Sequence, residues 1–409
     1  MLSVTDARAR IMNTFKPLGM ISLPIASAAG RVLAENVTAK TDLPLFDNSS
    51  VDGFAVRVSD LGDAGIDNPR TLEVIADIRA GTQSSVSLKP GKCARIMTGA
   101  PLPAGADAVV MVEDSDFKIR SSGTQAPKTV TIQKSVRPGE NVRRQGDDLH
   151  SGDLVLHKGT RLRAQEIGLL AMLGAAMVPV YQKPKLALLS SGDELLPVEA
   201  NLTPGKIHDA NSFILAALCE SAGVELIHLG VASDTETDIR SRLERAVEEH
   251  ADVIVSSAGV SVGAFDYIKS IVDQDGELDF WKVDMRPGKP LAFGKYHGIP
   301  FFGLPGNPVS AFVGFEVFVR PALEKLSGQT PRERPRLKAR LAEPVDSDGR
   351  ESYLRAIVIE EHGQLMAHLT GHQGSGNIFS LVQANALLIV PSGVKSLPAT
   401  SEAEIWFIE

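Results

Sequence analysis

Residues 252–269 read DVIVSSAGVSVGAFDYIK, and this stretch decides which fold the chain adopts. The apolar run from Val253 to Val255 predicts a buried strand, and the small residues after it predict a tight loop before a helix. Gly259 and Gly263 let the backbone approach a ligand closely, and the start of a helix favours an anion. The stretch therefore indicates either a phosphate-binding loop or an ordinary strand-to-helix connection, and alone it favours neither.

The bulk properties of the chain restrict the class of protein. A length of 409 residues predicts about three domains, and 43% hydrophobic with 22% charged residues is typical of a folded globular chain. The formal charge of −8 argues against binding along a nucleic acid, so an anionic ligand would have to be held locally. Cys93 and Cys219 stand far apart and predict buried thiols in a reducing compartment. With no long apolar segment and no signal peptide, we expect a cytoplasmic protein without membrane contact.

The amino-terminal region contains two segments with helical spacing. Residues 3–15 place apolar side chains on one helical face behind Thr5, the expected N-cap, and residues 26–35 indicate a second short helix. The tract 141–178 is turn-rich and then helical, and it resembles neither of the segments beside it. We therefore expect residues 1–44 and 141–178 to form one discontinuous domain.

Three further domains follow from the rest of the chain. Short alternating runs separated by Gly and Pro predict an all-β domain over residues 45–140. Strands and helices alternate over residues 179–327, which predicts a doubly wound parallel α/β domain. A linker rich in Pro and Arg leads to short strands over residues 328–409, expected to form a C-terminal β-barrel. The predicted fold class is multi-domain α/β plus β, with the all-β domain inserted in the N-terminal half.

Polar residues follow each of five predicted strands in the α/β domain. In chain order these are Asp193 and Glu194, Asp234, Asp266 beyond the glycine loop, Arg286 and Lys289, and Gly306 with Asn307. Because ligands of parallel α/β sheets bind at the carboxyl ends of the strands, we expect the five loops at one edge. Acids at this edge suit Mg²⁺, and bases suit an anion. The chain has no GxSxG, HExxH or P-loop motif, which argues against covalent or zinc hydrolase chemistry.

Each of these residues also has a purely structural interpretation. Glu194 could favour the start of a helix, and Asp234 could be an N-cap. Arg286 and Lys289 could lie in a solvated turn, and Pro308 could simply begin a helix. The convergence of five loops on one edge nevertheless favours a phosphate-bearing ligand.

Eight stretches carry a resemblance to a known family. They are LPLFDNSSVDGFAVR (43–57), RIMTGAPLPAGADAVVMVED (95–114), GENVRRQGDDL (139–149), SSGDEL (190–195), GKIHDANS (205–212), SAGVSVGAFDYIK (257–269), MRPGKPLAFG (285–294) and FGLPGNPVSA (302–311). In this order they resemble the molybdopterin molybdenumtransferase family, to which a domain of eukaryotic gephyrin is similar. The resemblance covers nearly the whole chain.

The resemblance implies a homodimeric enzyme that inserts molybdenum from molybdate into adenylylated molybdopterin and releases AMP. This Mg²⁺-dependent reaction is the last step of molybdenum cofactor biosynthesis. The family's cleft lies between the α/β layer and the C-terminal β domain of the other subunit. Expected partners include the molybdopterin adenylyltransferase and the enzymes that accept the cofactor. Two alternatives are an adenylyltransferase, against which the β domains argue, and a non-catalytic gephyrin-like scaffold, against which the cleft acids argue.

Individual roles follow by motif position. The resemblance implies catalytic roles for Asp52, Thr98, Glu194, Asp234 and Asp266. It places Mg²⁺ on Asp266 and Glu194, and molybdate on Arg286, Lys289, Arg350 and Ser375. It assigns cofactor binding to Ser257, Gly259, Ser261, Gly263, Pro287, Lys289, Pro290, Gly306 and Asn307. The chain departs from many relatives at Ala264, where they carry an acid, and at Arg286, where Lys is frequent.

Overall fold

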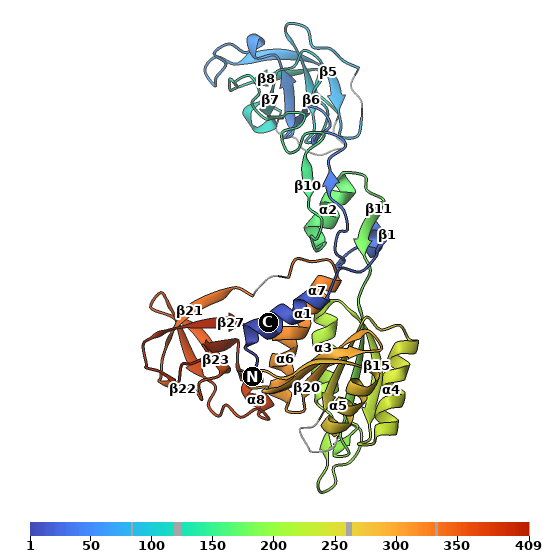
Figure 1. Cartoon of the computed structure of the whole chain (residues 1–409). Helices are drawn as coiled ribbons and strands as arrows, with labels where there is room; N and C mark the ends of the chain where they lie inside the picture. The colour runs from blue at the N-terminus through green and yellow to red at the C-terminus, as the bar shows by residue number, and fades with distance from the viewer. Residues whose placement is uncertain (83–84, 118–124, 259–263, 332–333, 409) are drawn as a thin grey trace. The chain divides into compact units, whose positions relative to one another are not determined.

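The computed structural model describes residues 1–82, 85–117, 125–258, 264–331 and 334–408, and only the backbone at 258 and 264–266. The chain divides into two compact units (Figure 1). The first comprises Met1–Glu35, Lys158–Gly168 and Ala175–Glu409, and the second comprises Asn36–His157 and Leu169–Gly174. No helix in these described ranges is long and apolar enough to cross a membrane.

The centre of the first unit is a six-stranded sheet. In spatial order its strands are β15 (Glu225–Ala232), β12 (Lys185–Ser191), β16 (Val253–Ala258), β20 (Ile299–Pro305), β19 (Pro290–Tyr296) and β17 (Gly276–Lys282). The first four run parallel, and β19 runs antiparallel to both of its neighbours. The connections on either side of β19 are short, and parallel pairing would need a crossover of a dozen or more residues. The expected parallel sheet therefore has an antiparallel strand near one edge.

Helices cover both faces of this sheet, as the sequence predicted. One face packs against α1 (Val4–Thr14), α3 (Asn211–Ala222), α6 (Pro308–Gly314) and α7 (Arg320–Leu326). The other packs against α4 (Glu236–Glu248) and α5 (Ala264–Asp275). The expected single helix after β20 contains a π-helical segment, Phe315–Val319, between α6 and α7. Since β17 runs in the same direction as β20, all five predicted loops leave the sheet at one edge.

The amino-terminal segment forms one helix and not two. Helix α1 begins behind Ser3, whose hydroxyl accepts a hydrogen bond from the backbone of Asp6 at 3.0 Å, so Thr5 is not the N-cap. The helix expected over residues 26–35 is wrong, because only the short 3₁₀ turn η1 (Ile25–Ser27) forms. In this segment the N–H of Leu33 donates to the distant Thr160 carbonyl instead.

Short strand pairs connect the amino-terminal segments with later parts of the chain. Strand β1 (Met20–Pro24) pairs with β11 (Met177–Tyr181), β2 (Val37–Thr38) with β10 (Leu154–Leu156), and β3 (Asn48–Ser49) with β9 (Val142–Arg143). Helix α2 spans Ala164–Met172. The discontinuous domain and the other boundaries expected from the sequence stay predictions.

The second unit contains the predicted all-β domain. Its sheet has the order β7 (Ala108–Met111), β4 (Gly53–Val56), β6 (Lys92–Ile96), β5 (Arg70–Ile78) and β8 (Thr129–Ile132). The short 3₁₀ turns η2 (Val58–Asp60) and η3 (Val112–Asp114) lie beside it. Buried Phe54, Val110 and Ile132 lie in its core.

The C-terminal region is the predicted β-barrel. Strands β23 (Glu351–Glu361), β24 (Gln364–Leu369), β21 (Arg336–Leu341), β27 (Glu402–Phe407) and β25 (Ala386–Val390) pair in this order. The pairing of β25 with β23 closes the ring. Strand β18 (Met285–Arg286), from the hairpin between β17 and β19, pairs with the start of β23. The barrel is therefore joined directly to the loop edge of the α/β sheet. Strands β22 (Val345–Asp346) and β26 (Ser396–Leu397) pair beside it, β13 (Leu195–Leu196) pairs with β14 (Ile207–His208) in the α/β domain, and α8 spans Ile378–Gln383.

Candidate active site

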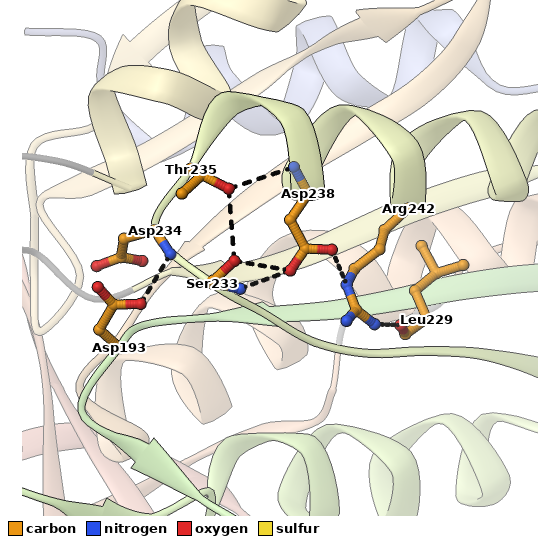
Figure 2. Close-up of polar contacts among 7 residues, drawn as sticks. All are labelled: Asp193, Leu229, Ser233, Asp234, Thr235, Asp238 and Arg242. Carbon is orange, nitrogen blue, oxygen red and sulfur yellow. Dashed lines mark hydrogen bonds and ion pairs between the residues drawn. The ribbon is translucent and has the colours of Figure 1, made fainter.

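The turn after β12 places two acidic side chains at the loop edge. The Asp193 carboxylate accepts a hydrogen bond from the backbone N–H of Asp234 at 3.0 Å, which joins this turn to the loop after β15 (Figure 2). Glu194 leads into strand β13, so the interpretation as a helix-start acid is wrong. A Cβ at Gly192 would lie 2.6 Å from Oε2 of Glu194, and φ there is +151°. Glycine at 192 thus allows Glu194 to fold back over the turn.

The N-cap of α4 is Thr235, which leaves the neighbouring Asp234 free of that role. The pKa of Asp234 is raised, first by burial and also by the charges of Asp193 and Glu194, against the lowering effect of a backbone hydrogen bond at Asp193. Its Oδ1 is buried and has no hydrogen-bond partner among the described residues. The N-cap interpretation of Asp234 is therefore wrong.

Asp238, close to Asp234 in sequence, has the opposite environment. It accepts hydrogen bonds from the backbone and hydroxyl of Ser233, at 2.8 and 2.9 Å, and from Nε of Arg242 at 3.0 Å (Figure 2). The hydrogen bond from the Ser233 backbone is the largest cause that lowers the pKa of Asp238. The charge of Asp238 is therefore compensated by Ser233 and by Arg242 on the same helix, whereas burial and two neighbouring carboxylates act on that of Asp234.

The predicted Mg²⁺ ligands are only partly described. Asp266 lies in the first turn of α5, but its side chain is outside the described residues. Gly259, Ser261 and Gly263 lie outside them altogether. In the described part of the chain, no three His, Cys, Asp or Glu side chains converge as metal ligands do. The assignment of Mg²⁺ to Asp266 and Glu194 stays a prediction.

One amide, which the sequence interpretation missed, connects the middle of the site. Nδ2 of Asn211 donates to Oγ of Ser257 and to the Gly306 carbonyl, each at 2.7 Å. Ser257 is the last residue but one of β16 and Gly306 follows β20, so Asn211 brings together two predicted cofactor-binding residues. Asn211 lies in the quoted stretch GKIHDANS, but nothing in that stretch distinguishes it from a residue that only begins a helix.

The basic side of the site is the hairpin between β17 and β19. Arg286 is not in a solvated turn as the structural interpretation allowed, because it pairs with Ser352 in the barrel. Its charge acts on both Asp348 and Arg355. The backbone carbonyl of Lys289 accepts a hydrogen bond from Val283 at 3.1 Å and closes the hairpin, in which Pro287 and Pro290 flank Lys289.

Arg350, the predicted molybdate ligand, already has partners. Its Nε donates to Oδ2 of Asp348 at 3.0 Å, and its Nη1 donates to the Met285 carbonyl at 3.0 Å. The hydrogen bond from Arg350 is the largest cause that lowers the pKa of Asp348. Arg350 therefore forms an ion pair with Asp348, and its hydrogen bond to the Met285 carbonyl supports the backbone just before Arg286.

Arg355 was missed by the sequence interpretation, and it is the most unusual cation of the site. Its side chain is fully buried, at 0% exposure. Nε donates to Ser380 Oγ and Nη2 to the Gly374 carbonyl, both at 3.0 Å, while Nη1 has no partner in the described residues. Burial, together with the charge of Arg286, lowers the pKa of Arg355 to about 10. A buried guanidinium with an unused donor and no carboxylate bonded to it in the described chain fits an anion site.

The loop of residues 371–377 carries Ser375 beside Arg355. Oγ of Ser375 accepts a hydrogen bond from Nδ2 of Asn307 at 2.9 Å, and its carbonyl accepts one from the backbone of Val309 at 3.1 Å. Helix α6 does begin at Pro308, as the structural interpretation expected, but the Asn307 side chain reaches Ser375 and makes no cap hydrogen bond. The structure thus brings Asn307, Ser375 and Arg355 together.

The two predicted residues of the second unit meet each other. Oδ1 of Asp52 accepts hydrogen bonds from the backbone N–H and the hydroxyl of Thr98, both at 2.8 Å. The pair holds the segment before β4 against the turn after β6.

Comparison with known proteins covers the whole chain. Residues 2–174 match the family model described as MoeA N-terminal region (domain I and II), residues 187–325 match a probable molybdopterin binding domain, and residues 338–408 match MoeA C-terminal region (domain IV). The three family models match consecutive parts of the chain, with the probable molybdopterin binding domain between the N-terminal and C-terminal regions.

Curated relatives and solved structures agree with these matches. Molybdopterin molybdenumtransferase 2 of Mycobacterium tuberculosis is 36% identical over 99% of both chains. Molybdopterin molybdenumtransferase of Haemophilus influenzae is 36% identical over 95% of this chain and 94% of its own. The crystal structure of the molybdopterin biosynthesis MoeA protein from Pyrococcus horikoshii has a TM-score of 0.80 at 33% identity, covering 100% of this chain and 99% of that one. The chain therefore belongs to the molybdopterin molybdenumtransferase family.

Proposed function

We propose that this chain inserts molybdenum from molybdate into adenylylated molybdopterin and releases AMP in a Mg²⁺-dependent step, the last of molybdenum cofactor biosynthesis. The observation that carries the proposal is Arg355, a fully buried cation with an N–H donor that has no partner among the described residues. The charge of Arg286 acts on it, and the loop with Ser375 binds its guanidinium through the Gly374 carbonyl. A small inorganic dianion such as molybdate matches this arrangement of donors and charges.

The molybdate would be held by groups from three segments. Arg355 offers Nη1 from β23, Arg286 adds charge from β18, and Lys289 adds charge from the hairpin. Oγ of Ser375 accepts from Asn307 and still has its own proton to donate to an oxyanion. We assign to Arg350 the support of the Met285 carbonyl in place of a direct contact with molybdate.

The opposite side of the edge suits the phosphate groups of the substrate. Ser257 lies near the end of β16 and Gly306 follows β20, at the edge where phosphates bind in such folds. The buried, unpartnered oxygen of Asp234 and the neighbouring like charges fit a cation. Asp266 and Glu194 would hold Mg²⁺, which would neutralise charge on the phosphoanhydride as AMP leaves.

Replacing the proposed metal ligand should slow the reaction strongly at ordinary Mg²⁺ concentrations. Because Asp266→Ala removes a carboxylate ligand, we expect molybdate-dependent AMP release to fall at least about tenfold and to need more Mg²⁺. AMP release is measured against Mg²⁺ concentration for the wild type and the variant. Full turnover with an unchanged Mg²⁺ requirement would refute the metal role.

Asp234 and Asp238 (Figure 2) should affect the stability of the fold with opposite dependence on pH. The folded pKa of Asp234 is raised, so the folded state gains stability below the ordinary Asp value and loses it as the pH rises through the raised pKa. The folded pKa of Asp238 is lowered, so its contribution is present above the ordinary value and is lost as the pH falls through the lowered pKa.

These signs predict the behaviour of two matched variants. At neutral pH and without Mg²⁺, Asp234→Asn should stabilise the protein relative to the wild type, and Asp238→Asn should destabilise it. Both differences should shrink as the pH is lowered. Urea unfolding of the three proteins across this pH range measures them, and a shift of the same sign for both variants would contradict the assignment.

The remaining roles are part of the same proposal. We assign Asp52 and Thr98 to catalysis and the protein to the cytoplasm. We also assign it a homodimeric state, which a measurement of its molar mass in solution tests. The proposed partners are the adenylyltransferase and the cofactor-accepting enzymes. The function itself is tested by molybdate-triggered AMP release from adenylylated molybdopterin. AMP transfer from ATP onto molybdopterin would instead identify the chain as an adenylyltransferase, which its family does not favour.

A further inference from the structure

Asn211 holds two loops of the α/β edge with a single amide nitrogen. The side chain projects from the first residue of α3, and Nδ2 donates to Ser257 and to Gly306, each at 2.7 Å. Because the Gly306 carbonyl can only accept, the orientation of the amide is fixed. Oδ1 is buried and lacks a hydrogen-bond partner in the described part of the chain.

The hydrogen bonds continue from Gly306 into the barrel. Asn307, the next residue, donates to Oγ of Ser375 at 2.9 Å. Gly374, just before Ser375, accepts from Arg355 at 3.0 Å. One path of hydrogen bonds and adjacent residues therefore runs from the end of β16, across Asn211, to the buried guanidinium.

The two ends of this path belong to different halves of the proposed reaction. Ser257 lies on the side assigned to the phosphate groups of the substrate, and Ser375 and Arg355 lie on the side assigned to molybdate. The pterin and molybdate must meet in a near-attack arrangement, with reacting atoms about 3 to 3.5 Å apart. A shift of the β20–α6 loop would change the separation of the two halves.

We propose that Asn211 is a positioning residue that sets the distance between the phosphate-binding end of β16 and the molybdate-binding groups of the barrel. The inference rests on the proposed function. Asn211 acts through Gly306 and Ser257, so its removal should slow the transfer while each reactant still binds. The unpartnered Oδ1 offsets part of what the amide contributes to stability, so the fold should tolerate the substitution.

Steady-state kinetics of molybdate-dependent AMP release test the proposal. In Asn211→Ala we expect kcat to fall about 10- to 100-fold, while KM for molybdate stays within about threefold and the melting temperature changes little. Asn211→Asp keeps the size and can accept from the Ser257 hydroxyl, but it repels the Gly306 carbonyl. Its kcat should therefore fall as far as that of the alanine variant.

The matched control is the adjacent residue. The hydroxyl of Ser212 lies within hydrogen-bond distance of Ser190 and bonds to Asp209 at the same helix start, and it makes no bond to Gly306 in the described structure. Ser212→Ala should keep kcat within about twofold of the wild type.

The outcomes distinguish a failure of the inference from a failure of the proposed function on which it rests. A wild-type enzyme without molybdate-dependent AMP release would overturn the proposed function and the inference with it. An active wild type with Asn211→Ala at wild-type kcat would overturn the inference alone. Equal losses in Ser212→Ala, or a raised KM at unchanged kcat, would also overturn it, because positioning predicts neither.

Discussion

Arg355→Met should lose molybdate-dependent AMP release by about a hundredfold or more, the largest loss of activity that the site predicts. The side chain is fully buried, and its Nη1 is the unused donor of the proposed oxyanion pocket. Methionine fills a similar volume without charge or donors. Arg355→Lys keeps a charge but lacks the planar fork, so it should also be impaired, by about tenfold or more.

The thermal stability of Arg355→Met should not fall with its activity. A buried cation without a bonded carboxylate opposes folding, so Arg355→Met should unfold at the same temperature as the wild type or higher. Molybdate should raise the melting temperature of the wild type and leave that of the variant unchanged, because ligand binding stabilises only a protein that binds it. This combination separates loss of the anion site from loss of the fold.

Arg350→Met is the matched control, because the sequence pointed to Arg350 and the structure points to Arg355. Loss of Arg350 breaks the ion pair with Asp348 and the bond to the Met285 carbonyl but leaves Nη1 of Arg355 in place. It should lower activity less than Arg355→Met does. The assignment would be reversed if AMP release by Arg355→Met stayed within about threefold of the wild type while Arg350→Met was inactive.

Glu316→Ala should produce the largest loss of stability, about 3 to 5 kcal/mol. Glu316 is 2% exposed and accepts from Arg320 at 2.8 Å through both carboxylate oxygens and from Arg334 at 2.6 Å. Arg334 also donates to the Phe407 carbonyl at 3.0 Å, and its guanidinium lies 5.3 Å from the Trp406 ring centroid. The carboxylate thus ties the π-helical segment to the last barrel strand, and its loss leaves two guanidinium groups without their partner.

Urea unfolding followed by tryptophan fluorescence measures this effect, because Trp406 lies beside Arg334. The control is Glu249→Ala at the C-cap of α4, which breaks an ion pair between Glu249 and Arg245, whose side chains are 45% and 44% exposed. Exposed pairs of this kind contribute less than about 0.5 kcal/mol. A Glu316 variant no less stable than the Glu249 variant would contradict the role of the buried carboxylate.

The sequence predicted the loop edge well, because apolar runs followed by polar loops depend on local pattern. Four predicted site residues lie at that edge because the sheet strand directly before each of them ends there. They are Glu194, Asp234, Arg286 and Asn307. The antiparallel direction of strand β19 was missed although its signal is local. His297 and Gly298 form the two-residue connection to β20, both with positive φ, which is the geometry of a tight hairpin turn.

The residues missed at the site depend on packing that the sequence does not show. Arg355 lies within the apolar strand YLRAIVI, and a charge in such a run is a signal of a buried ion. Only the folded contacts show that Arg350 pairs with Asp348, whereas Arg355 has no carboxylate partner among the described residues. Asn211 acquires its partners from two strands that are far away in the chain, so no local pattern could identify it.

The most direct test of the account is single-turnover AMP release by the purified wild-type protein loaded with adenylylated molybdopterin and Mg²⁺. We predict that molybdate triggers the release of AMP while sulfate, a dianion of similar shape, does not. AMP release at the same rate without molybdate, or no release at any molybdate concentration, would contradict the account.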